Sequence, residues 1–170
     1  MTENADTAGE ARGRFPVAVV LQRTPATSPW IEHVWDATGI AVNGQYPDRE
    51  PQLVRDDGKT AVYLVGGLQV SLHADECESY YYNLVSETPR AYVVAHATDD
   101  NDRPQPFCVS MSFDEAHAYL EGDDRIFAVE VPPELYRWTE QFVIANYFPQ
   151  KKLKRKLRDW SADTTGEAPA

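Results

Sequence analysis

Two cysteines and four histidines are the side chains of this chain best suited to chemistry. They are Cys77, Cys108, His33, His73, His96 and His117. The spacing of His73 and Cys77 could bring two metal ligands together. The chain has no second pair of ligand residues at the spacing of a metal-binding motif, so we expect no metal site. Acidic neighbours of Cys77 disfavour its thiolate, and apolar neighbours of Cys108 predict a buried, inert thiol. Both cysteines are therefore interpreted as packing residues.

The carboxylates gather in turns and polar loops, where turn formation and solubility explain them. The pair Gly66-Gly67 lacks the spacing of a dinucleotide fingerprint, and the chain contains no P-loop or G-x-S-x-G motif. We therefore predict no catalytic residue and no cofactor, and an enzyme is the less favoured class.

Aromatic and basic residues are the better candidates for binding. Aromatic side chains supply anchors at protein interfaces, and basic ones contact acidic partners. The predicted binding residues are Trp30, Trp35, Tyr81, Lys151, Lys152, Lys154, Arg155, Lys156 and Arg158. Tyr80, Tyr82 and Trp138 are further candidate anchors, although several of these aromatics must belong to the core.

The charge of the chain is unevenly distributed. The net charge is −11, and residues 151–158 contain six of the sixteen basic residues and no acidic one. A solvated helix end, a site for an acidic protein partner and a contact with anionic lipid or nucleic acid are all compatible with this composition. The acidic remainder argues against nucleic-acid binding by the body of the protein.

The periodicity of apolar residues predicts a sheet with few helices. Strands are expected at 15–21, at 30–42 with an interruption near Gly39, in a hairpin of 53–55 and 60–65, and at 68–72, 79–85, 91–97 and 107–111. Gly66-Gly67 is expected to form a second tight turn. In the strand at 79–85, Tyr80 and Tyr82 would face the core and Tyr81 the other side, with a partner-binding surface as the alternative.

Two helices complete the pattern. Ser112 and Glu115 have the spacing of a capping box, which predicts a short helix that stops at Gly122. A second helix begins at Pro132-Pro133 and ends near Pro149, with Leu135, Trp138, Phe142 and Ala145 on its apolar face.

These elements predict an α+β fold, with a mostly antiparallel sheet of about six to eight strands packed by the C-terminal helix. The predicted organisation is a disordered segment at 1–14, one domain at 15–149, a basic amphipathic helical extension at 150–160 and a disordered segment at 161–170. Two isolated cysteines, no secretory signal and no long apolar stretch predict a cytoplasmic protein without a membrane span.

Several segments resemble a family of uncharacterised bacterial proteins encoded in gene clusters for molybdenum-dependent formate dehydrogenase. They are FPVAVVLQRTPATSPWIEHVWDATGIAV, GGLQVSLHADECESYYYNLVSETPRAYVVAH, the helix that opens with Pro132-Pro133 and contains Trp138, and the basic tail. The resemblance covers about residues 15–158 and implies an accessory protein in assembly, maturation or regulation of the dehydrogenase, with a dehydrogenase subunit or maturation factor as partner.

The alternative function is binding or conversion of a molybdenum-cofactor precursor. It would need a pocket with converging polar groups, for which His73, His96 and Arg90 are the candidates. Some relatives carry a label that links them to cofactor guanylylation, but this chain lacks the Gly-rich N-terminal loop of such a nucleotidyltransferase.

Overall fold

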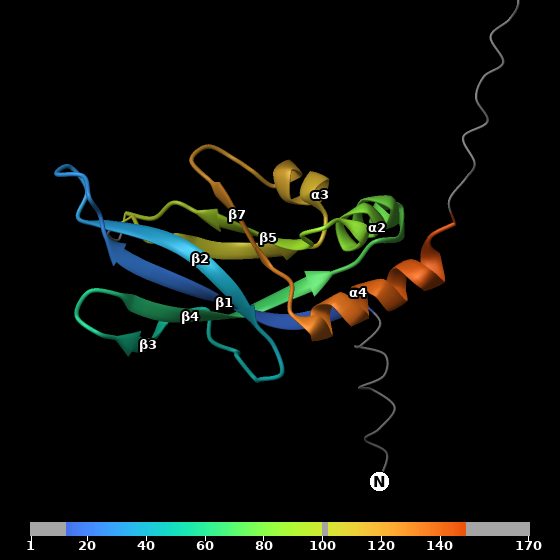
Figure 1. Cartoon of the computed structure of the whole chain (residues 1–170), viewed down its shortest axis with the longest axis horizontal. Coiled ribbons are helices and arrows are strands. Elements are labelled where there is room, and N and C mark those ends of the chain that lie inside the picture. Colours follow the sequence, from blue (N-terminus) through green and yellow to red (C-terminus); the bar gives the residue numbers. More distant parts are fainter. Residues whose placement is uncertain (1–12, 100–101, 149–170) are drawn as a thin grey trace, which may run out of the picture.

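The computed structural model describes residues 13–99 and 102–148, which form seven strands and four helical segments (Figure 1). The strands are β1 (Arg14–Pro25), β2 (His33–Ala41), β3 (Gln52–Asp56), β4 (Ala61–Ser71), β5 (Arg90–His96), β6 (Gln105–Ser110) and β7 (Arg125–Glu130). The helical segments are the 3-10 helix η1 (Ala74–Glu76) and the α-helices α2 (Cys77–Val85), α3 (Phe113–Ala118) and α4 (Pro133–Asn146). The predicted α+β class is confirmed.

All seven strands belong to one mixed sheet. Its order is β2-β1-β4-β6-β5-β7, with β3 also paired to β4. The pairs are antiparallel except for β4 and β6, which run parallel through the pairing of Val70 with Val109. The two edge strands β2 and β7 lie against each other, so the sheet is strongly curled.

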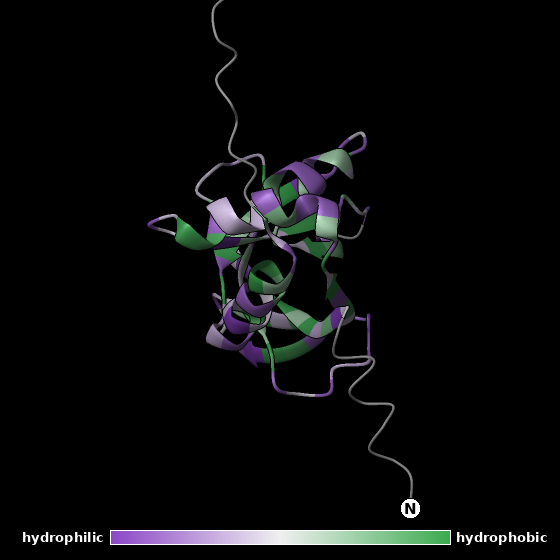
Figure 2. Ribbon diagram, turned by 90° about the vertical axis from the view of Figure 1, so that its right-hand side faces the viewer, coloured by the Kyte–Doolittle hydropathy of each residue, from purple (hydrophilic) through white to green (hydrophobic). Residues whose placement is uncertain are grey.

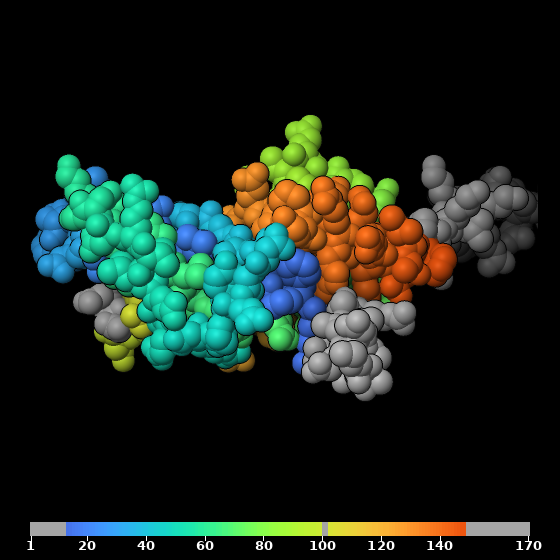
Figure 3. Space-filling model, turned by 90° about the horizontal axis from the view of Figure 1, so that it is seen from below, coloured from blue at the N-terminus to red at the C-terminus, as the bar shows by residue number. Residues whose placement is uncertain are grey.

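The curled sheet has two different ends. At the helical end, where β4 finishes and β5 begins, the chain forms η1 and α2, and α4 packs beside α2 (Figures 1 and 3). At the open end, β2 and β7 begin and β5 finishes. Figure 2 looks onto the helical end and shows helices of mixed hydropathy in front of largely hydrophobic strand segments.

The predicted strand at 15–21 is confirmed within β1, where Val17, Ala18, Val19 and Leu21 are all buried. In β4, Leu68, Val70 and Leu72 alternate toward the core as predicted, although Leu72 lies just beyond the strand. The interruption predicted near Gly39 is wrong, because β2 continues through this residue. The pairing of β1 with β2 instead shifts register there, between Val20 opposite Gly39 and Leu21 opposite Ala37.

The hairpin predicted around residues 56–59 connects β3 and β4. The Asp56 carboxylate accepts a hydrogen bond from the Gly58 N–H at 2.9 Å, and the Asp57 carboxylate accepts from the Thr60 N–H at 2.7 Å. The Thr60 N–H, together with the Lys59 N–H, holds the pKa of Asp57 below its usual value. These hydrogen bonds are the turn contacts that Asp favours.

The prediction of a second turn at Gly66-Gly67 is wrong, because β4 continues through both residues. They instead form a bulge, where the pairing of β1 with β4 shifts register between Val17 and Val19. Gly67 has a φ of 71°, and an added Cβ on Gly66 would lie 2.2 Å from the Tyr46 carbonyl oxygen. The glycines therefore bend the strand and let the 42–51 connection approach its backbone.

The prediction of a strand at 79–85 is also wrong, because these residues form most of α2. Cys77, Tyr80 and Leu84 are buried, and their spacing of three and four residues is that of one helix face. Tyr80 therefore lies in the core as expected, whereas Tyr82 is 59% exposed. The helical conformation is favoured because the Tyr80 hydroxyl accepts the His73 N–H at 3.0 Å and the Asn83 side chain bonds to the sheet.

The two predicted helices are present as α3 and α4. Ser112 caps α3 by accepting the Glu115 N–H at 3.2 Å, as predicted. The helix ends at Ala118 rather than at Gly122, which has a φ of 56° in the turn before β7. On α4 the buried residues are Leu135, Thr139 and Val143, with Trp138 and Phe142 half-buried beside them. Ala145 is exposed, which corrects its predicted place on the apolar face, because the buried face follows a spacing of four.

One hydrophobic core joins the sheet to the helices. Trp138 of α4 packs on Phe15 of β1 with ring centroids 5.3 Å apart, and Phe142 packs on Tyr80. Within the described part of the chain, no helix is long and apolar enough to cross a bilayer. The predicted segments 1–14, 150–160 and 161–170 lie outside the described residues, except for residues 13 and 14.

Candidate functional site

A cavity of about 240 Å³ lies at the open end of the curled sheet. The start of β2, the end of β5, the start of β7 and the connection before β6 each contribute to its wall. The lining residues are Ile31, His33, Val34, Trp35, His96, Ala97, Asp102, Pro104 and Arg125. Two imidazoles, a guanidinium and a carboxylate therefore meet apolar surface in one place.

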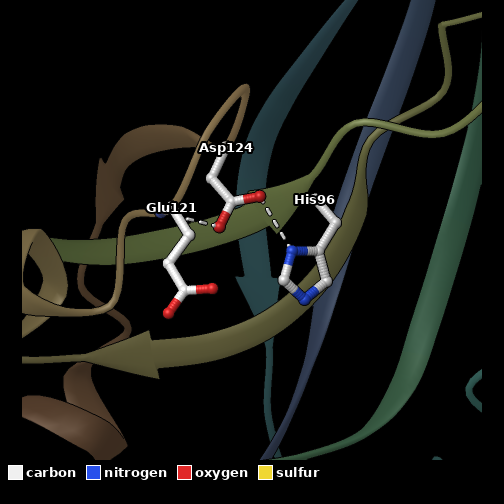
Figure 4. A network of polar contacts seen from close by, with 3 residues as sticks. All are labelled: His96, Glu121 and Asp124. Atoms are coloured by element: carbon white, nitrogen blue, oxygen red, sulfur yellow. Dashed lines mark hydrogen bonds and ion pairs between the residues drawn. The ribbon is translucent and has the colours of Figure 1, made fainter.

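His96 is held in place from two sides. Antiparallel pairing of Ala95 with Arg125 puts His96 beside Asp124, the residue before β7. The His96 Nδ1 lies 2.8 Å from the Asp124 Oδ1, and the other Asp124 oxygen accepts the Glu121 N–H at 3.1 Å (Figure 4). Phe107 of β6 stacks on the imidazole with ring centroids 3.8 Å apart.

This arrangement keeps the Asp124 carboxylate ionised. The Asp124 side chain is 7% exposed and that of His96 is 53% exposed. The hydrogen bond from His96 holds the pKa of Asp124 below its usual value, so the carboxylate is ionised at neutral pH. The second imidazole nitrogen points away from Asp124 in Figure 4.

The two other nitrogen-bearing side chains complete the polar wall. The Arg125 guanidinium lies over the Phe127 ring, 4.9 Å from its centroid, and His33 has its Nδ1 4.0 Å from the Glu32 carboxylate. Such groups donate hydrogen bonds and bind anionic groups, while Trp35 and Pro104 offer apolar contact. The chemistry of the cavity is that of polar recognition beside an apolar surface.

Large hydrophobic side chains are exposed in and beside the cavity. Trp30 is 91% exposed, Ile31 is 50% exposed and Val34 is 49% exposed. They belong to the β1–β2 connection and the start of β2, where the Ala26 N–H bonds to the Glu32 carbonyl at 3.1 Å. We refer to Trp30, Ile31 and Val34 together with the cavity as the open-end surface.

The structure separates the sequence-predicted binding residues. Trp30 is exposed and directly precedes Ile31, which lines the cavity, while Trp35 is 6% exposed, packs on Tyr63 and contributes one wall of the cavity. Tyr81 is 39% exposed at the helical end, where its ring stacks on Tyr147 with centroids 5.0 Å apart. The six predicted basic residues of 151–158 lie outside the described residues.

The predicted trio of His73, His96 and Arg90 does not come together. His96 ends β5 at the open end, whereas Arg90 begins the same strand at the helical end and His73 follows β4 there. Six residue steps along an extended strand separate His96 from Arg90 by about 20 Å. The cavity therefore contains one of the three residues.

Sequence reasoning missed the other side of the cavity, which depends on β7. Asp124 and Arg125 stand at the start of this strand, and no strand was predicted at 125–130. The composition of the run Ile126-Phe127-Ala128-Val129 favours a strand, and this run is the sequence feature that could have indicated β7.

The cysteines are buried or half-buried and unpaired, as expected of packing residues. Burial raises the pKa of Cys77, with a further contribution from Asp75, and burial raises the pKa of Cys108 to about 11. Both thiols are therefore protonated at neutral pH. Within residues 13–99 and 102–148, no group of three or more His, Cys, Asp or Glu side chains is arranged to hold a metal ion.

Comparison with curated proteins and with solved structures yields no match. A family model described as "Protein of unknown function (DUF3305)" matches residues 16–156, a range that runs from β1 through the helical end and into the basic segment. Since this match covers most of the chain, the protein belongs to the DUF3305 family.

Proposed function

We propose that this protein is a cytoplasmic, non-catalytic accessory protein that binds a protein partner through its open-end surface. The proposed partner is a subunit or maturation factor of a molybdenum-dependent formate dehydrogenase. That choice of partner is supported by the resemblance of the segments around Trp30, α2 and α4 to proteins encoded beside such enzymes.

The single observation that carries the binding proposal is the exposure of Trp30, at 91% of its surface, beside Ile31 and Val34. Exposed apolar clusters with a polar surround are typical of interaction sites, and Trp is enriched among the residues that dominate binding energy. Truncating such an anchor costs about 2 kcal/mol or more. This corresponds to a loss of roughly 30-fold in affinity.

The cavity beside this cluster would supply specificity. A partner that covers Trp30 would also bring polar groups toward His96 and Arg125, which line the adjacent cavity. Polar groups left unpaired on burial reduce affinity, so only a partner with complementary groups would be accepted.

Affinity purification of the full chain from a native host tests the proposal. The unaltered protein should recover a formate dehydrogenase subunit or maturation protein, and Trp30→Ala should reduce that recovery strongly. Ile144→Ala is the matched control, because Ile144 is 73% exposed on α4 at the helical end. The proposal is contradicted if Trp30→Ala and Ile144→Ala recover equal amounts of the dehydrogenase component. It is also contradicted if neither variant nor the unaltered protein recovers one.

A second candidate function is binding of a molybdenum-cofactor precursor, and the cavity with His33, His96 and Arg125 favours it. Titration with molybdopterin nucleotides distinguishes the two functions. A small-molecule site would bind them below millimolar concentration and lose them in His96→Ala, whereas a protein-docking site would bind none.

A further inference from the structure

A groove at the helical end is separate from the open-end surface. It consists of two adjoining cavities of about 350 and 380 Å³ that share Ser79, Tyr82 and Asp114. Because these residues belong to α2 and the first turn of α3, the groove runs between the two helices. We refer to it as the α2–α3 groove.

One half of the α2–α3 groove is acidic. Asp75, Glu76, Glu78 and Asp114 line it, and no basic side chain is among its described lining residues. The N-termini of α2 and α3 offset only part of this charge, because each helix end is equivalent to about half a positive charge.

The floor of the acidic half is polar as well. The Ser112 hydroxyl donates to the Glu76 carboxylate at 2.9 Å and also contacts the Ser79 hydroxyl at 2.9 Å. Four carboxylates thus line one side of the groove, where a cation would be stabilised.

The other half of the groove is aromatic. Tyr82 is 59% exposed and Phe113 is 51% exposed, and Phe113 packs edge-on against Tyr92 with ring centroids 5.5 Å apart. A groove with an acidic half and an aromatic half matches a segment that alternates basic and apolar residues.

This chain contains such a segment beyond α4. Residues 151–158 hold six basic residues and no acidic one, interleaved with Leu153 and Leu157 and followed by Trp160. The described chain ends at Phe148, directly after Tyr147, whose ring stacks on Tyr81 of α2. The basic segment therefore starts next to the helix that forms one wall of the groove.

The length of the segment is sufficient to reach the groove. The nine residues of α2 span about 13 Å along the helix axis. The ten residues 149–158 can extend to roughly 33 Å. A tethered segment of this length has an effective concentration on the order of millimolar at a site within its reach.

We propose that residues 150–160 dock in the α2–α3 groove of their own chain, with the basic side chains against its carboxylates and the apolar ones against Tyr82 and Phe113. Docking conceals the basic segment from other acidic molecules, and salt releases it because the contact is largely electrostatic. This proposal does not depend on the function proposed for the open-end surface.

Carbodiimide cross-linking of the dilute full chain tests the contact directly, because the reagent joins a lysine amine to a nearby carboxylate with loss of water. We expect amide links from Lys151, Lys152, Lys154 or Lys156 to Asp75, Glu78 or Asp114 in the monomer band. Links found only in a dimer band would overturn docking within one chain. Links to the groove no more frequent than links to Asp36, an exposed carboxylate on β2, would overturn the contact itself.

Trypsin cleavage within 151–158 of the full chain provides a second measurement, normalised to a free peptide of residues 149–160. At low salt, Glu78→Gln combined with Asp114→Asn should speed cleavage roughly fivefold, as expected for release of a tethered segment. Asp36→Asn is the matched control and should leave the rate unchanged. If the double variant does not fold, the unaltered chain decides the question. Its normalised cleavage rate should rise with salt concentration, and a rate that is independent of salt refutes the docking.

Discussion

Asn83 of α2 should be one of the most sensitive polar positions in the protein. Its side-chain amide donates to the Arg90 carbonyl at 2.7 Å and to the Met111 carbonyl at 2.9 Å, and its oxygen accepts the Arg90 N–H at 3.0 Å. One side chain thus connects α2 to the start of β5 and the residue after β6. Asn83→Ala removes all three bonds and leaves their backbone groups without these partners.

The expected loss follows from the number of bonds. A typical hydrogen bond contributes about 0.5–1.5 kcal/mol, and an orphaned buried group costs more, so we expect the free energy of unfolding to fall by roughly 2–4 kcal/mol. For a domain of this size, that change lowers Tm by about 10 °C. Asn83→Asp should be as damaging at neutral pH, because it keeps the acceptor but places a carboxylate against two carbonyl oxygens.

Urea denaturation followed by tryptophan fluorescence measures this loss, with Tm from circular dichroism as the second readout. Asn146→Ala is the matched control, since the Asn146 amide donates only to the Phe142 carbonyl of its own helix, at 2.9 Å, and is exposed. The control should change stability by less than about 0.5 kcal/mol. If the loss in unfolding free energy for Asn83→Ala differs from that of the control by less than about 0.5 kcal/mol, the reasoning that these bonds hold α2 on the sheet is refuted.

Three further changes test other parts of the structure. Gly66→Ala should cost about 2–4 kcal/mol in urea unfolding, because its Cβ would lie 2.2 Å from the Tyr46 carbonyl, whereas Gly39→Ala has nothing within 4 Å and should cost far less. Glu115→Gln should flatten the pH dependence of stability. Burial raises the pKa of Glu115, so the folded chain loses stability as the pH rises above 4.5 and the buried carboxyl group ionises. A glutamine side chain stays neutral and removes that loss. An unchanged pH profile of urea midpoints would contradict this assignment. Trp35→Ala should cost about 3–5 kcal/mol because Trp35 is 6% exposed. Trp30→Ala should stay within about 0.5 kcal/mol; equal urea midpoints for the two tryptophan variants would show that their burial was misassigned.

The candidate site shows the limit of the sequence clearly. His96 could be recognised as a candidate because it ends an apolar strand, and Trp30 could be recognised by its residue type. Their common surface depends on β7, which brings Asp124 to within 2.8 Å of His96 through pairing with β5. These two residues are 28 positions apart, and no local pattern indicates that distance.

The tyrosine segment shows why local pattern misleads. Consecutive aromatics favour a strand, yet residues 77–85 are helical. The helix prevails because it buries Cys77, Tyr80 and Leu84 together against the core, whereas an extended segment would place Cys77 on the face opposite Tyr80 and Leu84. It also allows Asn83 to bond to the backbone at Arg90 and Met111.

By itself, the sequence determined the features that depend on neighbouring residues: the buried β1, the hairpin at Asp56–Lys59, the Ser112 cap of α3 and the start of α4 after its prolines. Hydrogen bonds and apolar spacing within a few residues are enough to specify these elements. Tertiary structure alone decided that β4 and β6 pair in parallel, that Gly66-Gly67 bend a strand and that α2 is a helix. It also decided which carboxylate meets His96. Each of these outcomes depends on contacts between distant segments, whose free energy outweighs local preference.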